Sequence, residues 1–254
     1  MNLRFLGTGF GPLKTKRKNT KDYRRPASLL IDDCILIDPT PAVFEFADDY
    51  ALSGLYRKVH TVLLTSPCDE RFCEQTLLEL LKSGQAIELY GPEHALERIP
   101  MHPLLHFHPV LPNKIFDIKD AKVISLPTLY KDDSQNLAFG YAICTDRSLL
   151  YMIDGGFLHP DAWELLKKLH FDHAVLGCPG GDAPSGAETI IKSNFELAKM
   201  LRSIFLDAKT ISPSARFFLS AIPMDKKRSI HDSLLEISRD SGFTVAYDGL
   251  YMNI

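Results

Sequence analysis

The sequence has no apolar run of the roughly 18 residues that a membrane-spanning helix needs, and MNLRFLGTGF at its start has few apolar residues before the first glycine. These absences predict a cytoplasmic protein with no membrane partner. A strong charge excess is also missing, because 29 Lys and Arg face 32 Asp and Glu for a net charge of −3. Any attraction to nucleic acid therefore has to be local.

No Pro-, Gly- or Ser-rich linker divides the 254 residues, of which 45% are hydrophobic and 24% charged. This composition can bury a substantial core, so we expect a single domain over residues 1–254. Cysteine is sparse and odd in number, whereas a secreted scaffold pairs its cysteines, so the thiols are predicted to be reduced. The five are Cys34, Cys68, Cys73, Cys144 and Cys178.

Short β-rich runs bounded by Gly, Pro, Asp or Asn alternate with segments of helical periodicity. Strands are predicted at 3–6, 28–37, 59–65, 122–126, 137–144, 149–153, 173–176, 216–220, 243–247 and 250–252. Helices are predicted at 69–82, 160–170, 188–202 and 227–240. Alternation of this kind indicates a layered α/β fold. Strands followed by a helix, twice over, are typical of a pseudo-symmetric αββα sandwich.

Eight segments carry a family resemblance over nearly the whole chain. They are LGTGFGP, SLLIDDCILIDPTP, VLLTSPCDERF, LYGPE, VISLPTLY, LLYMIDGG, FFLSAIP and YDGLYMNI, in that order. Together they resemble hydrolases of the metallo-β-lactamase superfamily. The branch they resemble includes the cyclic phosphodiesterase that accompanies carbon–phosphorus lyase and the ribonuclease that trims transfer-RNA 3′ ends. The resemblance implies the four-layer αββα sandwich of that superfamily.

In that family a strand ends in Thr-His-x-His-x-Asp-His, which helps to hold two metal ions. The metal lowers the pKa of its bound water toward about 7 and so makes a nucleophile. On this motif Thr65 matches, Ser66 and Cys68 stand at the first two histidines, Glu70 at the aspartate and Arg71 at the third histidine. The resemblance therefore implies a degenerate metal-binding motif.

Three downstream positions complete the former cleft that the resemblance implies. The next histidine position falls in PTLYKDD, at Tyr130 to within a residue or two, and Asp154 of MIDGG matches the bridging aspartate. Ala221 of LSAIP stands where the family ends its strand in Thr-His. The branch's extra zinc site, built from cysteines after the first strand, has no counterpart between residues 11 and 27.

Arg71 is the substitution with the strongest physical consequence, because a guanidinium does not lose its proton in a protein. At ~4 Å and an effective dielectric constant of about 20, its repulsion from a divalent ion approaches roughly 8 kcal/mol. We therefore expect no metal cofactor here, and we expect Arg71 to replace the metal charge and pair with Glu70 or Asp154. The alternative is that Arg71 points to solvent from the first turn of a helix.

The leading hypothesis is a non-catalytic protein that keeps the pocket for ligand binding or serves as a scaffold. The rival hypothesis is a phosphodiesterase-like hydrolase with zinc or manganese on Cys68, Glu70 and Asp154, and only in that case is the chain an enzyme. A helix start after Cys68 and the nearby Arg71 are two influences that lower a thiol pKa. An inert, half-buried cysteine is the competing interpretation.

Residues 14–25, KTKRKNTKDYRR, hold seven Lys or Arg against one Asp. Such a run predicts phosphate or RNA contact, with Tyr23 available to stack on a base, although a solvated charged loop is the usual explanation. The candidate contact residues are Lys14, Lys16, Arg17, Lys18, Arg24 and Arg25. Possible partners are thus a phosphate-containing small molecule, a protein or, through this loop, nucleic acid.

His106 and His108 alternate in a way that places both imidazoles on one side of a strand. Such a pair can bind a metal ion, but the family carries no ligand in this segment. Ordinary surface or packed histidines are therefore the preferred interpretation.

Overall fold

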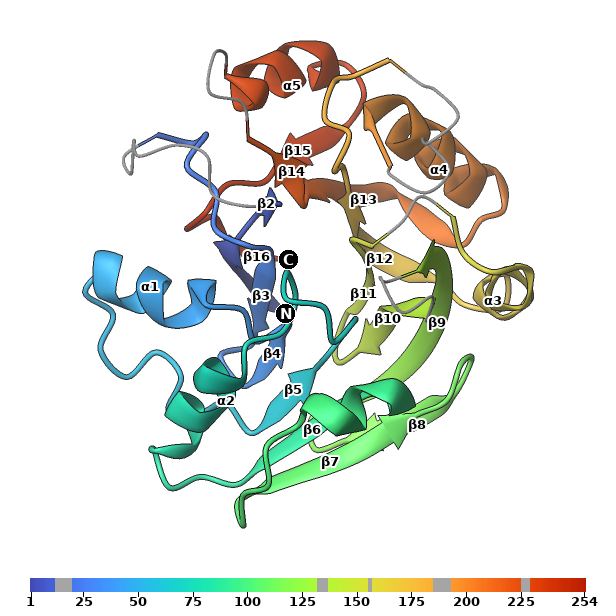
Figure 1. Cartoon of the computed structure of the whole chain (residues 1–254). Helices are drawn as coiled ribbons and strands as arrows, with labels where there is room; N and C mark the ends of the chain where they lie inside the picture. The colour runs from blue at the N-terminus through green and yellow to red at the C-terminus, as the bar shows by residue number, and fades with distance from the viewer. Residues whose placement is uncertain (12–19, 132–136, 155–156, 185–192, 225–228) are drawn as a thin grey trace.

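The computed structural model describes residues 1–11, 20–131, 137–154, 157–184, 193–224 and 229–254, the side chains of residues 130 and 131 excepted. Two seven-stranded sheets face each other, and helices cover their outer faces (Figure 1). The predicted αββα sandwich is confirmed.

The first sheet is antiparallel in one half and parallel in the other. Its order is β16 (Tyr251–Asn253), β1 (Asn2–Gly7), β3 (Ser28–Ile31), β4 (Ile35–Ile37), β5 (Thr61–Leu63), β6 (Ile87–Pro92) and β7 (Leu105–Val110). The strands from β4 to β7 are parallel. Its helices are α1 (Ala42–Asp49), α2 (Glu74–Leu81) and the 3₁₀ helix η1 (Glu93–Arg98).

The second sheet repeats this plan. Its order is β15 (Phe243–Val245), β13 (Ile211–Ser220), β12 (Phe171–Gly177), β11 (Ser148–Met152), β10 (Leu137–Cys144), β9 (Ala121–Lys131) and β8 (Ile115–Ile118). The strands from β11 to β15 are parallel and the others antiparallel. Its helices are α3 (Pro160–Leu166), α4 (Phe195–Asp207) and α5 (Ile230–Ser238). The short strands β2 (Gly9–Phe10) and β14 (Ile222–Pro223) pair separately.

Three apolar clusters fill the three spaces between the four layers. One lies between the sheets, where the rings of Phe5 and Phe218 meet at 5.5 Å between centroids. A second packs the helices α3, α4 and α5 on their sheet, and a third packs α1 and α2 on theirs. Within the described ranges, none of the helices is long and apolar enough to cross a membrane.

Several element boundaries differ from those predicted from the sequence. The predicted strand 28–37 is a hairpin, because Asp32 and Asp33 take φ of 49° and 59° between β3 and β4. The helix predicted from residue 69 begins at Glu74, after the extended N-cap Cys73. The helix predicted from residue 188 is described from Phe195, and residues 188–192 lie outside the described part.

Glycines at the end of β1 and the start of β2 let a distant segment pass close to the backbone. A Cβ on Gly7 would lie 2.0 Å from the carbonyl oxygen of Pro26, and one on Gly9 would lie 2.8 Å from that of Arg24. No larger residue fits such a contact without a backbone shift. The LGTG motif therefore holds the segment around Arg24 and Arg25 against the end of the sandwich.

Candidate functional site

The central cluster of the site lies where parallel strands of both sheets end. Asp38 directly follows β4, Thr65 follows β5 by two residues, and Asp154 follows β11 by two. Arg71 comes from the loop between β5 and α2. Because the carboxyl ends of parallel strands lie at one edge of a sheet, these four side chains meet between the sheets.

Arg71 is buried, with a side chain 1% exposed, and pairs with Asp154. Its Nε and Nη2 donate to Asp154 Oδ1 at 2.8 and 2.6 Å, and Nε lies 3.9 Å from Asp38 Oδ2. Burial alone would lower the pKa of Arg71, but the carboxylates of Asp154 and Asp38 more than offset this and raise it. Arg71 is therefore a fixed cation. The expected pairing with Asp154 is observed, and the solvent-exposed alternative is wrong.

Thr65 joins the two acidic groups. Its Oγ1 lies 2.8 Å from Asp154 Oδ2 and 2.9 Å from Asp38 Oδ2, and its backbone N–H donates to Asp38 Oδ1 at 2.8 Å. A hydroxyl has one proton and cannot donate to both carboxyl groups. Burial raises the pKa of Asp38 well above its ordinary value; Arg71 opposes the rise and Asp154 adds to it. A protonated Asp38 can thus donate to Thr65, which in turn donates to Asp154.

With Asp38 protonated, the buried cluster would hold one cation, one carboxylate and one neutral acid. Sequence reasoning missed Asp38, which is completely buried. The available signal was its place in the motif LIDP, directly after a buried strand and at the same sheet edge as Thr65.

Two residues at this edge have left-handed backbone conformations although neither is glycine. Asp38 has φ of 58° and Ala221 has φ of 49°. Ala221 is fully buried between β13 and β14. Such conformations carry strain of roughly 1–3 kcal/mol each and cluster at functional sites. The backbone strain therefore occurs at the same sheet edge as the side chains that differ from the family motif.

Cys68 does not have an activated thiol. Burial, followed by the nearby Asp154, raises the pKa of Cys68 to about 11 although Arg71 opposes the rise. The expected lowering by a helix start does not occur, because α2 begins at Glu74, six residues later. The backbone N–H of Cys68 donates to Ser66 Oγ at 3.3 Å, and Ser66 is buried.

Glu70 and Tyr130 were also expected in the cleft. Glu70 is half-buried in the loop before α2. The backbone of Tyr130 lies in β9, and its side chain lies outside the described part of the chain.

The central cluster does not fit a metal ion. Arg71 already donates to one oxygen of Asp154, and the hydroxyl of Thr65 contacts the other. Among the residues that the structure describes, one group of three His, Cys, Asp or Glu has ligand atoms within 4.8 Å of one another, and it is Cys34, His60 and Asp120. The alternative zinc or manganese set of Cys68, Glu70 and Asp154 is therefore not assembled by the fold.

The basic segment is only partly available to a partner. Lys14, Lys16, Arg17 and Lys18 lie outside the described residues. Arg24 is fully buried, where Nη1 donates to Thr8 Oγ1 and to the carbonyl of residue 246, both at 2.7 Å.

Arg25 is buried as well. Its backbone N–H donates to Asp248 Oδ2 at 2.7 Å, its guanidinium pairs with Asp49, and it lies over the ring of Tyr23 at 4.9 Å from the centroid. Arg24 is therefore not accessible to phosphate or RNA, whereas Arg25 lines the pocket described next.

A pocket of about 320 Å³ opens beside this buried segment. The exposed Lys21 lies at its wall with its ammonium 4.5 Å from the ring centroid of Tyr247. The lining residues are Thr20, Lys21, Tyr23, Arg25, Asp49, Tyr50, Tyr247 and Asp248. Aromatic rings with a surface cation suit a small ligand that carries an anionic group.

The two histidines of β7 contact one glutamate at the surface. His106 Nδ1 and His108 Nε2 lie 2.8 and 2.5 Å from the two carboxylate oxygens of Glu88 on β6. Partial burial raises the pKa of Glu88, but the hydrogen bonds with the two histidines outweigh this effect and lower it. The prediction that both imidazoles share one side of a strand is confirmed.

No family model matches the chain, and no curated protein matches it. Solved structures do. A diphosphatase of the PhnP family is 20% identical, covers 99% of this chain and 96% of its own, and superposes with a TM-score of 0.71. The metallo-β-lactamase-fold protein YhfI from Bacillus subtilis is 14% identical, with coverages of 99% and 98% and a TM-score of 0.73. Human tRNase Z, short form, is 15% identical, with coverages of 100% and 99% and a TM-score of 0.66.

These similarities show that the chain has the metallo-β-lactamase fold, as its motifs predict.

Proposed function

We propose that this metallo-β-lactamase-fold chain is a non-catalytic protein in which Arg71 supplies the charge that a metal ion supplies elsewhere in the fold. The observation that carries the proposal is the donation of Nε and Nη2 of Arg71 to a single oxygen of Asp154, at 2.8 and 2.6 Å. A divalent ion ~4 Å from that guanidinium would meet roughly 8 kcal/mol of repulsion at an effective dielectric constant of about 20. The degenerate motif is, on this proposal, a repacked structural centre.

The chemistry of the cluster supports a structural role. Metal-dependent hydrolysis needs an open coordination position that activates water. Here Thr65 links two acidic groups, and Asp38, with a pKa raised by burial, holds a proton. Each of these groups is engaged in stabilising another member of the cluster. The sandwich is then used as a binding protein or scaffold, with residues 1–254 as one domain.

The pocket beside Lys21 is the place where we expect a small ligand. Lys21 offers an exposed ammonium, and the rings of Tyr50 and Tyr247 offer flat apolar walls. A phosphate-containing small molecule with a ring matches these features. Similar structures include a diphosphatase and a tRNase Z, which supports a phosphate-containing ligand. All five cysteines are free thiols, which supports a cytoplasmic location within the same proposal.

The rival hypothesis is a hydrolase that uses Cys68, Glu70 and Asp154. The test is hydrolysis of bis(4-nitrophenyl) phosphate by the full chain, with zinc or manganese added in separate series. We expect no metal-dependent turnover above the rate without protein. Turnover that is lost in Cys68→Ser and kept in Cys144→Ser would overturn the proposal, because Cys144 ends β10 outside the cluster.

A further inference from the structure

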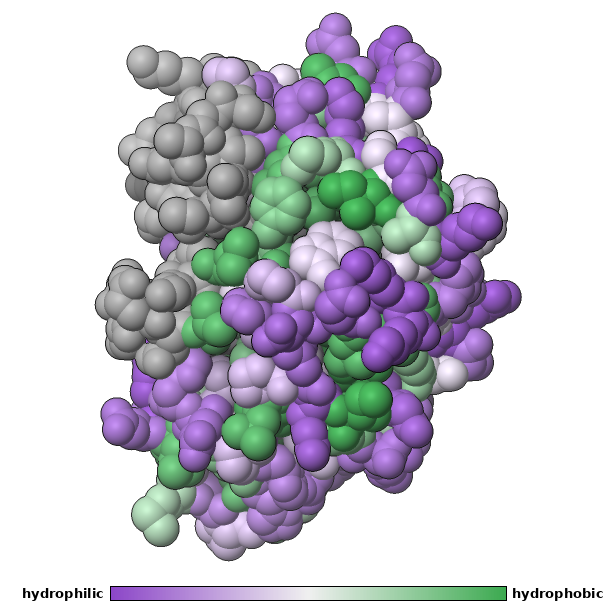
Figure 2. All heavy atoms as spheres, turned by 90° about the vertical axis from the view of Figure 1, so that its right-hand side faces the viewer, coloured by the Kyte–Doolittle hydropathy of each residue, from purple (hydrophilic) through white to green (hydrophobic). Residues whose placement is uncertain are grey.

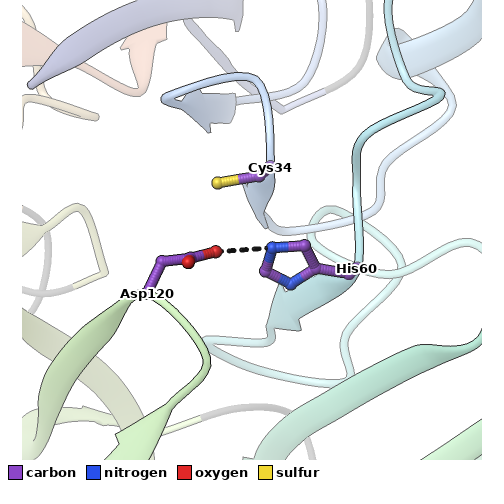
Figure 3. Close-up of side chains that lie close together, drawn as sticks. All are labelled: Cys34, His60 and Asp120. Atoms are coloured by element: carbon purple, nitrogen blue, oxygen red, sulfur yellow. Dashed lines mark ion pairs between the residues drawn. The ribbon is translucent and has the colours of Figure 1, made fainter.

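A second cluster of chemically versatile side chains lies at the opposite end of β4 and β5 from Arg71. Cys34 directly precedes β4, and His60 directly precedes β5. Asp120 lies in the turn between β8 and β9 of the other sheet. Figure 3 shows the three side chains converging on one small space from these separate elements. Their ligand atoms all lie within 4.8 Å of one another.

The backbone holds the two residues of the first sheet in register. The N–H groups of residues 60 and 61 both point to the carbonyl oxygen of Cys34, at 3.2 and 3.4 Å. His60 Nε2 lies 2.7 Å from Asp120 Oδ2, and its Nδ1 lies 2.9 Å from Thr61 Oγ1. Thr61 is buried, so this second contact fixes the plane of the imidazole ring.

The second contact of His60 is the one that a metal-binding histidine needs. Histidines that bind metal through one ring nitrogen almost always donate a hydrogen bond from the other. In the structure Nε2–H donates to the carboxylate of Asp120, and Nδ1 accepts from the hydroxyl of Thr61. When an ion binds at Nε2, the imidazole proton moves to Nδ1, which then donates to Thr61 Oγ1.

The carboxylates of Asp32, Asp33 and Asp120 near Cys34 favour a cation in this region. A thiol that coordinates a metal ion is deprotonated, so Cys34 would bind as a thiolate. Asp120 is 47% exposed and His60 is 13% exposed, so the cluster is open to solvent on the side of Asp120.

We propose that Cys34, His60 and Asp120 bind one Zn²⁺ through Sγ, Nε2 and a carboxylate oxygen, with water as the fourth ligand. Thiolate, imidazole and carboxylate together suit zinc rather than magnesium or calcium. Tetrahedral bonds of about 2.0–2.3 Å place ligand atoms about 3.5 Å apart, so side-chain shifts of about 1 Å suffice. Binding releases the thiol proton to solvent and replaces the hydrogen bond between His60 and Asp120. The ion would clamp the first sheet to the hairpin of the second.

This inference is independent of the proposed function, because the cluster shares no residue with the site of Arg71. The test uses the full chain freed of metal by a chelator and titrated with Zn²⁺, and with Co²⁺ as a spectroscopic probe. We expect one ion per chain, a thiolate-to-cobalt absorption band and a higher thermal midpoint with zinc. Cys34→Ser and Asp120→Asn should each weaken binding more than about a hundredfold, since losing a group that merely orients a ligand already costs 10–100-fold.

The controls separate this site from the cluster around Arg71. Cys144→Ser, which changes another half-buried thiol, and Cys68→Ser should keep both the affinity and the cobalt band. Thr61→Val should weaken binding roughly 10–100-fold while leaving all three ligands in place. Absence of zinc binding by the metal-free chain would overturn the inference and leave the proposed function intact. Binding that survives Cys34→Ser but is lost in Cys68→Ser would overturn both.

Discussion

Arg71 directs two donors, Nε and Nη2, to one oxygen of Asp154 and leaves the other oxygen to the hydroxyl of Thr65 at 2.8 Å. The same hydroxyl also contacts Asp38, so it links the ion pair of Arg71 and Asp154 to a second buried acid. A single cation therefore lies between two buried acids, and burial raises the pKa of one of them, Asp38, which favours its protonated form. Each member of this chain of contacts can be tested alone.

Removing the cation should be strongly destabilising. Arg71→Met leaves the carboxylate of Asp154 buried without a partner, which costs about 3–5 kcal/mol. The free energy of unfolding can be followed in urea by the fluorescence of the single tryptophan, Trp163. Lys82→Met, which removes an exposed pair with Glu79, should cost less than about 1 kcal/mol. Equal effects of the two substitutions would show that Arg71 does not hold the cluster together.

The proton on Asp38 should make stability fall with rising pH. Burial raises the pKa of Asp38, with Arg71 opposing and Asp154 adding, so the folded chain keeps a proton that the unfolded chain releases above about pH 4. This contribution is present at low pH and is lost as pH rises toward the folded-state pKa.

Asp38→Asn should remove that slope and fold well, because an amide mimics the protonated acid and asparagine tolerates the φ of 58°. The measurement is the urea midpoint between pH 4 and 8. Asp172→Asn is a control in which the pH dependence of stability has the opposite sign. Partial burial raises the pKa of Asp172, but hydrogen bonds from Ser148 outweigh this effect and lower it. An unchanged slope in Asp38→Asn would contradict the assigned protonation.

The hydroxyl of Thr65 should matter more than its shape. Thr65→Val removes the group between Asp38 and Asp154 and leaves a buried acceptor unsatisfied, at a cost of about 1–3 kcal/mol. Thr65→Ser keeps the hydroxyl and should recover most of the loss in the free energy of unfolding. If serine and valine were equally destabilising, the lost methyl packing would explain the effect instead.

His231 should make the protein sensitive to acid. Arg24 Nη2 lies 2.9 Å from His231 Nδ1, and burial, followed by the charge of Arg24, lowers the pKa of His231 to about 4. The unfolded imidazole takes a proton below about pH 6.5. Stability is therefore fully present above that pH and falls as the pH drops toward 4, by at most about 3 kcal/mol.

His231→Asn keeps an acceptor for Arg24 and should flatten this part of the pH profile. Thermal midpoints measured between pH 4 and 7 provide the test, with the exposed His170→Asn as the matched control. A profile for His231→Asn that still falls like the parent's would assign the acid sensitivity to other groups.

The alternation of strands with helices was sufficient to predict a layered α/β fold, because periodicity along a strand or helix reports which face is buried. The family resemblance carried by the order of motifs implied the αββα sandwich. The replacement of histidines by Ser66, Cys68 and Arg71 is equally a property of the sequence, since residue identity at a motif position needs no coordinates. The helix α1 and the strands β6 and β8 were not predicted as elements, and β7 was indicated only by the alternation of His106 and His108.

Tertiary structure decided which residues meet. Arg71 and Asp154 are 83 positions apart, and only the packing of two sheets selects this pairing over Glu70 or solvent. The same packing adds Asp38 to the cluster, buries Arg24 and gathers Cys34 with Asp120. Distances between segments remote in sequence depend on strand order and layer spacing, and burial and pKa follow from those distances. Periodicity assigns a side chain to a face but does not identify its neighbour across the core.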